Sequence, residues 1–375
     1  MLRKILKVVN FYKAWKHGNG FKPIHVSLYP TYRCNLKCRM CAFWRFNSKD
    51  VRLSAAEWYM LLDELKQCGT HSISFSGGEP LLFDDLIHVL EKAYRLNFKL
   101  SVTTNGTLID NEYAHVLTKY FNNVRISLHS GIEKIHDHIT QIEGSFLRTL
   151  EGIERLNSVR HKNKNEKKTK LTINVVINKL NYKTADTVID VLKTTKVDEI
   201  QFSLITLNTN FMPVNIRYDV ENFNKEITAL GLTFEEFRHY MKYVIPKIRA
   251  KAKRENLHVK WLPNNLQEVE VRNNLCIGRS GIYKNINTYC FAPYLTLCIT
   301  PFGRILPCDA ALLQEHQYIM GDVKRNRLSE IWNNEQFKKF RAHCQPPSYS
   351  FCHACCHVEL NKRLMRYRFL SYFIK

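Results

Sequence analysis

The sequence predicts an α/β protein, namely a partial (β/α)6 barrel of the TIM-like kind followed by a small C-terminal domain rich in cysteine. Short runs of β-branched and aromatic residues alternate with helical patterns over the first half of the chain. The 375 residues, 45% of them hydrophobic, suffice for one barrel-sized core and a smaller unit. The twelve cysteines lie toward the two ends, and residues 69–275 contain none.

Six runs are expected to form strands, at residues 24–30, 72–76, 99–104, 124–129, 170–177 and 199–205. The first helix should begin after Ser54, because Glu57 stands three positions later as in a capping box. Further helices are predicted near 84–96, 111–120, 145–157 and 181–194. Strands that each precede a helix imply a parallel sheet, whose functional groups gather at the carboxyl ends of the strands.

The chain is expected to divide into five regions. They are a basic amphipathic segment at 1–22, the barrel at 23–215, a helical linker at 216–285, the cysteine-rich domain at 286–357 and a basic aromatic tail at 358–375.

The formal net charge of +22 is concentrated in a few segments. Residues 1–49 carry eleven Lys and Arg without an acid, and residues 160–170 and 360–375 are also basic. Such segments are typical either of a solvated basic face or of a surface that meets an anionic partner. Peripheral contact with an anionic membrane is one prediction, whereas nucleic acid is less favoured because no RNA-reading motif accompanies the charge.

The cysteine distribution and the lack of a long apolar run indicate the compartment. Cysteines clustered at two sites favour metal ligation in a reducing environment over disulfides. No apolar run approaches the ~20 residues of a membrane span, and the N-terminus lacks a continuous apolar signal core. We therefore expect a cytoplasmic protein.

The stretch CNLKCRMC places Cys34, Cys38 and Cys41 within eight positions. A structural zinc site needs four ligands, so three cysteines leave it one short. A 4Fe-4S cluster held by three cysteines keeps one iron open to a small molecule. This triplet favours a reactive iron-sulfur site.

Small and polar residues follow three successive predicted strands. These segments are SGGEP at 76–80, TTNGT at 103–107 and SLHS at 127–130. Each alone is better explained as a turn or a helix cap. Together at successive strand ends they indicate a binding site.

With these motifs in this order, residues 24–205 resemble the radical S-adenosylmethionine (SAM) enzymes. The resemblance implies that Cys34, Cys38 and Cys41 hold a 4Fe-4S cluster whose open iron binds SAM. It also implies cofactor contacts from Gly77, Gly78, Glu79, Pro80, Asn105 and Ser127. One departure is Met40, where the family often has an aromatic residue against adenine. An external electron donor such as flavodoxin or ferredoxin, reductive cleavage of SAM and hydrogen abstraction by a 5′-deoxyadenosyl radical are implied as well.

A second group of cysteines resembles the SPASM and shorter twitch extensions of that family. The run from Cys290 to Cys308 is expected to form a hairpin that turns at PFG. The resemblance implies an auxiliary 4Fe-4S cluster on Cys290, Cys308, Cys352 and Cys355, and a zinc ribbon is the alternative. No role is assigned to the remaining cysteines, each of which could be a core residue or a thiol hydrogen donor: Cys276, Cys298, Cys344 and Cys356.

An auxiliary cluster near the barrel mouth favours an oxidoreductase that oxidises a small polar substrate, anionic or lipid-linked, whose identity is unknown. The alternative is a peptide or protein maturase, although only about 23 residues precede the barrel. A third hypothesis, of another class, is an iron-sulfur or zinc module for binding or electron transfer without SAM chemistry. The GGEP segment argues against it. The sequence names no catalytic base.

Overall fold

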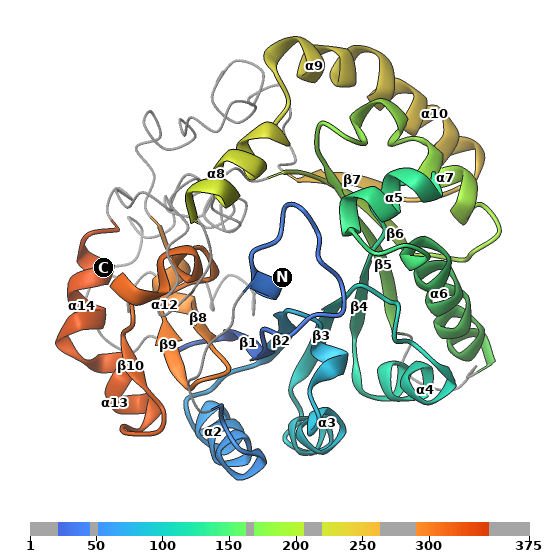
Figure 1. Ribbon diagram of the computed structural model, residues 1–375. Helices are drawn as coiled ribbons and strands as arrows, with labels where there is room; N and C mark the ends of the chain where they lie inside the picture. The colour runs from blue at the N-terminus through green and yellow to red at the C-terminus, as the bar shows by residue number, and fades with distance from the viewer. Residues whose placement is uncertain (1–21, 46–51, 163–168, 206–219, 263–289, 345–375) are drawn as a thin grey trace, which may run out of the picture.

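A ten-stranded curved sheet with helices along its outer side organises the chain (Figure 1). This computed structural model describes residues 22–45, 52–162, 169–205, 220–262 and 290–344. The strand order is β10-β9-β8-β1-β2-β3-β4-β5-β6-β7. Each neighbouring pair from β1 to β7 is parallel, as the alternation of strands and helices predicts. The predicted partial barrel is confirmed.

The six predicted strands form close to their expected positions. They are β1 (His25–Thr31), β2 (Ser72–Gly77), β3 (Lys99–Thr104), β4 (Asn123–Ser127), β5 (Lys170–Ile177) and β6 (Glu199–Leu204). A further strand, β7 (Val259–Leu262), extends the sheet from within the region for which we expected a helical linker. Four residues give too short an alternation to be recognised as a strand.

Helices follow the strands, most of them on the outer side of the sheet (Figure 1). They are α2 (Ala55–Gln67), α3 (Leu86–Arg95), α4 (Asn111–Tyr120), α5 (Glu133–Thr140), α6 (Ser145–Lys162), α7 (Thr187–Leu192), α8 (Val220–Ala229), α9 (Phe234–His239) and α10 (Ile245–Arg254). The capping box of Ser54 and Glu57 is present at the start of α2. The helix predicted at 181–194 is interrupted, and a 3₁₀ turn at Tyr182–Thr184 precedes α7. Local bonds explain this, because the Asn178 and Asn181 side chains accept hydrogen bonds from nearby backbone N–H groups.

The predicted hairpin lies between Cys290 and Cys308. It consists of β8 (Thr296–Ile299) and β9 (Arg304–Leu306), which pair antiparallel. Gly303 in the turn has a φ of +88°, a conformation that suits glycine. Around the hairpin lie β10 (Gly321–Asp322), α12 (Ala292–Leu295), α13 (Leu328–Asn333) and α14 (Glu335–Ala342).

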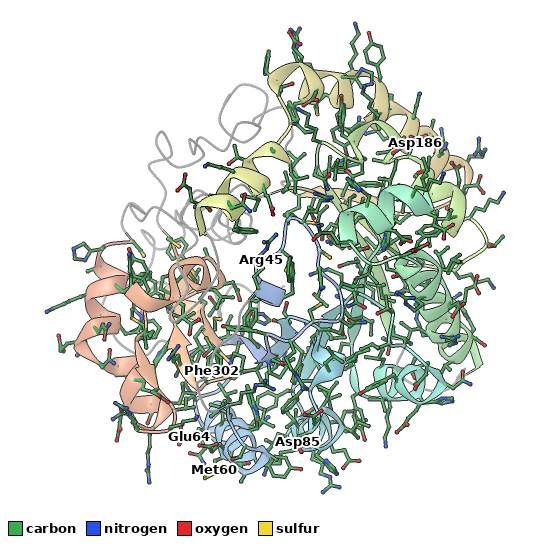
Figure 2. All side chains as sticks on the ribbon, viewed as in Figure 1. Arg45, Met60, Glu64, Asp85, Asp186 and Phe302 are labelled. Atoms are coloured by element: carbon green, nitrogen blue, oxygen red, sulfur yellow. The ribbon has the colours of Figure 1, made fainter. Side chains whose placement is uncertain are left out.

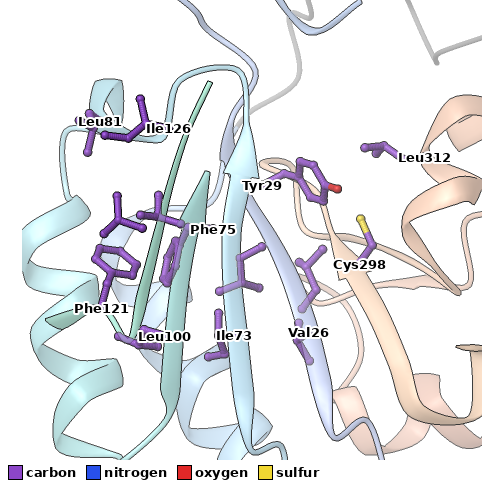
Figure 3. Packing of buried hydrophobic residues seen from close by; sticks show 14 of the residues in the cluster. Val26, Tyr29, Ile73, Phe75, Leu81, Leu100, Phe121, Ile126, Cys298 and Leu312 are labelled. Atoms are coloured by element: carbon purple, nitrogen blue, oxygen red, sulfur yellow. The ribbon is translucent and has the colours of Figure 1, made fainter. Parts of the chain in front are cut away.

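The hairpin is part of the barrel sheet, because β8 pairs in parallel with β1 and brings Cys298 opposite Ser27. One hydrophobic core consequently runs from the barrel into the C-terminal region (Figure 3). Cys298, fully buried, belongs to this core near Tyr29 and Leu312 (Figure 3). The structure thus favours a packing role for this cysteine.

No helix in the described ranges is long and apolar enough to cross a membrane. The tail at 358–375 and all but the last residue of the segment at 1–22 lie outside the described residues, as do Cys276, Cys352, Cys355 and Cys356.

Candidate active site

The triplet Cys34, Cys38 and Cys41 lies on the loop that leaves β1, and all three side chains are half-buried. The end of α5 holds this loop. The Lys37 N–H donates to the Thr140 carbonyl at 3.0 Å, and the Arg39 N–H donates to the Ile139 carbonyl at 2.9 Å. Carbonyls in the last turn of a helix lack partners within the helix, so they are available as anchors.

The surroundings of the three sulfurs suit a metal-bound state better than bare thiolates. Burial raises the pKa of the Cys34 thiol to about 12, and it raises the pKa of Cys38 and Cys41 as well. The Cys34 Sγ faces the Leu36 N–H at 3.4 Å and the Asn105 Nδ2 at 3.9 Å. Three thiols on one short loop, with N–H groups directed at the Cys34 sulfur, have the chemistry of an iron-sulfur donor set, although among the described residues they are not drawn together into a metal-binding arrangement.

Cys34 of this loop borders a pocket that is open to solvent. An open pocket of about 810 Å³ is lined by Arg33, Cys34, Trp44, Leu81, Leu82, Phe83, Asp84 and Tyr113. The Arg45 guanidinium, labelled in Figure 2, pairs with Glu226 of α8 at 2.7 Å, and its charge partly opposes the burial that raises the pKa of Cys41.

Gly77 and Gly78 let two chain segments approach closely. A Cβ on Gly78 would stand 2.1 Å from the Arg33 carbonyl oxygen, and Gly77 has a φ of +121°. The N–H groups of Gly78 and Glu79 donate to the carbonyls of Thr31 and Arg33. The glycines therefore bring the end of β2 against the segment that leads into the cysteine loop.

Glu79 connects the ends of β2 and β3. Its fully buried carboxylate accepts hydrogen bonds from the Leu81 N–H (3.1 Å), the Thr104 hydroxyl (2.8 Å) and the Asn105 N–H (2.8 Å). Burial raises the pKa of Glu79 to about 7, although the three donors act in the opposite direction. Because these three protein donors fix the carboxylate, and one of them is the Asn105 N–H, Glu79 orients the loop that carries Asn105.

Asn105 completes a chain of contacts from Glu79 to the cysteine loop, because its Nδ2 also donates to the Asn35 Oδ1 at 2.8 Å. Pro80 starts the 3₁₀ turn Pro80–Leu82, and Glu79 caps this turn. Ser127 is half-exposed at the end of β4, on the strand next to β3. The structure thus gathers the predicted residues of the barrel at one edge of the sheet.

The second cysteine group is buried beside β1. Cys290 and Cys308 are 8% and 5% exposed. The Cys290 N–H donates to the Cys344 carbonyl at 3.1 Å, which places Cys344 next to a predicted ligand. Cys344 had no assigned role because the resemblance gave the four ligand positions to Cys290, Cys308, Cys352 and Cys355. Cys344 is therefore a further candidate cluster ligand in this region.

Comparisons with known proteins identify the class. The model of the radical SAM superfamily matches residues 28–192, and the model of the SPASM iron-sulfur cluster-binding domain matches residues 290–356. This chain belongs to the radical SAM superfamily, with a SPASM domain at its C-terminal side. Its cofactors are a 4Fe-4S cluster and SAM, and its chemistry needs an external electron donor.

Two curated relatives cover most of the chain. The Fe-coproporphyrin III synthase of Methanosarcina barkeri is 33% identical over 314 residues, which are 81% of this chain and 72% of the relative. The AdoMet-dependent heme synthase of Oleidesulfovibrio alaskensis is 25% identical over 346 residues, or 88% and 78% of the two chains.

Among solved structures, SuiB of Streptococcus suis bound to S-adenosylmethionine has a TM-score of 0.64 at 22% identity. The alignment covers 94% of this chain and 77% of SuiB. The enzyme anSMEcpe with bound AdoMet has a TM-score of 0.61 at 18% identity, with 91% and 88% covered. At these identities the likeness concerns the fold alone.

Proposed function

We propose that the chain is an oxidoreductase that removes a hydrogen atom from a small anionic molecule and then transfers one electron to its C-terminal cysteine region. The observation that carries this proposal is the pairing of β8 with β1. Strand β1 leads directly into the cysteine loop, and β8 lies between Cys290 and Cys308. An electron acceptor held there would lie close to the site of hydrogen abstraction.

The roles of the barrel residues follow from their positions. Cys34, Cys38 and Cys41 would hold the cluster, and the segment Gly77–Pro80 with Asn105 and Ser127 would border SAM. When bound, cluster and SAM supply the electron and the carbon radical that an unactivated C–H bond requires. The protein's own contribution is orientation, through the bonds from Glu79 to Asn105 and from the end of α5 to the cysteine loop.

Cys290 and Cys308, with Cys352 and Cys355 from outside the described residues, would hold the auxiliary cluster. Removal of one hydrogen atom and then one electron amounts to a two-electron oxidation. With loss of a proton as well, the product would be a dehydrogenated molecule. Where the radical forms next to a carboxylated carbon, CO₂ would leave in place of the proton and an alkene would result.

Charge and relatives support an anionic substrate. The chain has a formal net charge of +22. The two curated relatives are named for Fe-coproporphyrin III and heme, and both of these tetrapyrroles carry carboxylate side chains. A tetrapyrrole carboxylic acid is therefore the first substrate candidate for this chain.

The test uses the anaerobically reconstituted full chain with SAM, reduced flavodoxin and iron coproporphyrin III, followed by mass spectrometry. We expect 5′-deoxyadenosine together with a porphyrin that has lost hydrogen, or hydrogen and CO₂. A Cys290→Ala/Cys308→Ala variant should still form 5′-deoxyadenosine but should not accumulate the oxidised product. An isomer of unchanged mass as the sole product would contradict the assignment as an oxidoreductase.

A further inference from the structure

The inner face of the barrel sheet is polar and reachable by solvent. Along β3, Leu100 and Val102 are 1% exposed beneath the outer helices, whereas Ser101 and Thr103, which alternate with them, are partly exposed. Strand β4 repeats this alternation. Because successive side chains of a strand point to opposite faces, the exposed set lines the concave side in Figure 1.

Arg125 of β4 belongs to this inner face. The register aligns it with Thr103 of β3 and Thr172 of β5, and Thr172 is aligned with Glu199 of β6. Ser127 stands two positions later, at the carboxyl end of the same strand. Arg125 therefore lies one inward-facing position deeper in the barrel than the candidate SAM contact.

The guanidinium of Arg125 has no partner in the described part of the chain. Its Nε is buried without a hydrogen bond, and none of its nitrogens forms an ion pair with a described residue. Burial lowers the pKa of Arg125, although Glu199 acts in the opposite direction. Leaving a buried donor such as this Nε without a hydrogen bond is costly, so such a group is typical of a site that a ligand completes.

Glu199 is already committed to other cations. Its carboxylate pairs with Lys170 at 2.9 Å and also with Lys260, and His258 lies 3.4 Å away. With one acid among these basic groups, this part of the described inner face attracts anions.

A second donor lies on the neighbouring strand β5, diagonally across from Arg125, two positions after the Thr172 that is aligned with Arg125. Asn174 of β5 is aligned with Ser127, and its Oδ1 accepts hydrogen bonds from Gln201 Nε2 (3.0 Å) and Ser203 Oγ (3.0 Å). These two bonds fix the amide so that Nδ2 is the end left for a ligand, and Nδ2 donates to none of the described residues. A guanidinium and an amide N–H₂ on adjacent strands match the two oxygens of a carboxylate.

We propose that Arg125 and Asn174 form an anion site on the inner face of the barrel that binds a carboxylate of the substrate. This inference rests on the proposed function, and it adds the residues that recognise the substrate. Bound there, a carboxylate would fix the substrate below the carboxyl end of β4, with its neighbouring carbons directed toward the cysteine loop. The carboxylate of SAM has the same chemistry, so the experiment must separate the two sources.

The first experiment titrates the reconstituted full chain with coproporphyrin III and with its tetramethyl ester, which lacks the charge. The variants are Arg125→Met, Arg125→Lys and Asn174→Ala, and the matched control is Arg95→Met, which removes a charge from exposed Arg95 on α3. We expect Arg125→Met to weaken binding of the acid about tenfold or more, with Arg125→Lys in between, since lysine keeps the charge but loses the planar fork that binds both carboxylate oxygens. Binding of the ester should not change.

Affinity for SAM, measured by equilibrium dialysis on the same proteins, identifies the source of the carboxylate. A loss confined to coproporphyrin III supports the proposal. A loss confined to SAM overturns the substrate assignment and gives the site to the cofactor. If Arg125→Met binds both ligands as Arg95→Met does, no carboxylate site exists there.

A second probe keeps this inference separate from the tetrapyrrole hypothesis. Glutarate, a simple dicarboxylate, should raise the melting temperature of the wild type more than that of Arg125→Met, with chloride at equal ionic strength as the control. If the wild type does not bind coproporphyrin III, but glutarate still raises its melting temperature more than that of Arg125→Met, the tetrapyrrole assignment is wrong and the anion site is supported. Equal increases in the melting temperature of the wild type and of Arg125→Met would show that no anion site exists there.

Discussion

Glu79 shows how one residue can position the site through hydrogen bonds to other protein groups. Its carboxylate accepts three hydrogen bonds from donors of the protein and thereby fixes Asn105, which faces the Cys34 sulfur. The resemblance to radical SAM enzymes suggests that Glu79 contacts SAM. The observed bonds add a positioning role for this side chain.

Glu79→Gln should lower the free energy of unfolding of the anaerobic holoprotein by about 1–3 kcal/mol. The substituted amide brings N–H groups to a place where three donors already converge, so at least one bond becomes a donor–donor contact. Urea unfolding measures the loss. Thr104→Val, which removes a single donor, should cost less, and an unchanged stability of Glu79→Gln would contradict this account.

Two buried histidines predict a dependence of stability on pH. Burial and the neighbouring His136 lower the pKa of His129 to about 3, and burial lowers the pKa of His136 to about 4, although Asp137 opposes the latter shift. Both are neutral in the folded state, whereas in the unfolded chain they titrate near ~6.5. The unfolded state binds more protons below that pH, so stability is complete above it and falls on acidification.

We expect His136→Gln to reduce this slope by about 1.4 kcal/mol per pH unit between about pH 6.5 and pH 5. Denaturant unfolding at several pH values measures the slope. His115→Gln, at an exposed position on α4, is the control for the loss of a histidine. Identical slopes for the wild type and His136→Gln would refute the prediction.

At the scale of elements, α2 of the barrel is joined to α13 of the C-terminal region. The Leu328 N–H at the start of α13 donates to the Glu64 carboxylate on α2 at 2.6 Å. The first N–H groups of a helix have no partner within it, so a carboxylate there satisfies one and meets the positive end of the helix dipole. Together with the β8–β1 pairing, this contact joins the two regions.

Glu64→Ala should lower the free energy of unfolding by about 1–2 kcal/mol, because it leaves the Leu328 N–H without its charged acceptor. Glu64→Gln keeps an acceptor oxygen and should lose less. Thermal and urea unfolding of the three proteins compare them directly. Equal losses in both variants would show that the side chain acts in some other way.

At the scale of the molecule, two cysteine sets predict two clusters. The wild type should bind about eight irons, four in each cluster. A Cys34→Ala/Cys38→Ala/Cys41→Ala variant should lose half of the iron and all cleavage of SAM. A Cys352→Ala/Cys355→Ala variant should also lose half of the iron, yet retain some cleavage. Cleavage that survives the triple change would remove the central assignment, and zinc bound to the wild type would favour a zinc ribbon in the SPASM region.

The basic segments 1–22 and 358–375 predict contact with an anionic surface. The full chain should sediment with phosphatidylglycerol vesicles at low salt and less at physiological salt, since each cation near the surface contributes about 1 kcal/mol. Phosphatidylcholine vesicles are the control. Absence of the protein from both pellets would contradict the prediction.

Local signals account for the part of the site that the sequence predicts. Cys34, Cys38 and Cys41 fall within eight positions, and Asn105 directly follows a strand that its own composition predicts. The capping box at Ser54 is equally local. The sequence analysis did not predict α5 or β7. α5 has eight residues of mixed polarity and β7 has four residues, and both are too short to show a clear hydrophobic period.

The sequence by itself determined the six barrel strands, the cysteine triplet, the hairpin after Cys290 and the family, because each depends on residues that are neighbours along the chain. Only the tertiary structure decided that β8 joins β1, that the end of α5 anchors the cysteine loop, and that the Arg125 Nε is buried without a hydrogen bond in the described part of the chain. The physical reason is that these features depend on register and on packing between distant segments. Spacing along the chain does not encode which strand becomes a neighbour or which buried charge is left for a ligand.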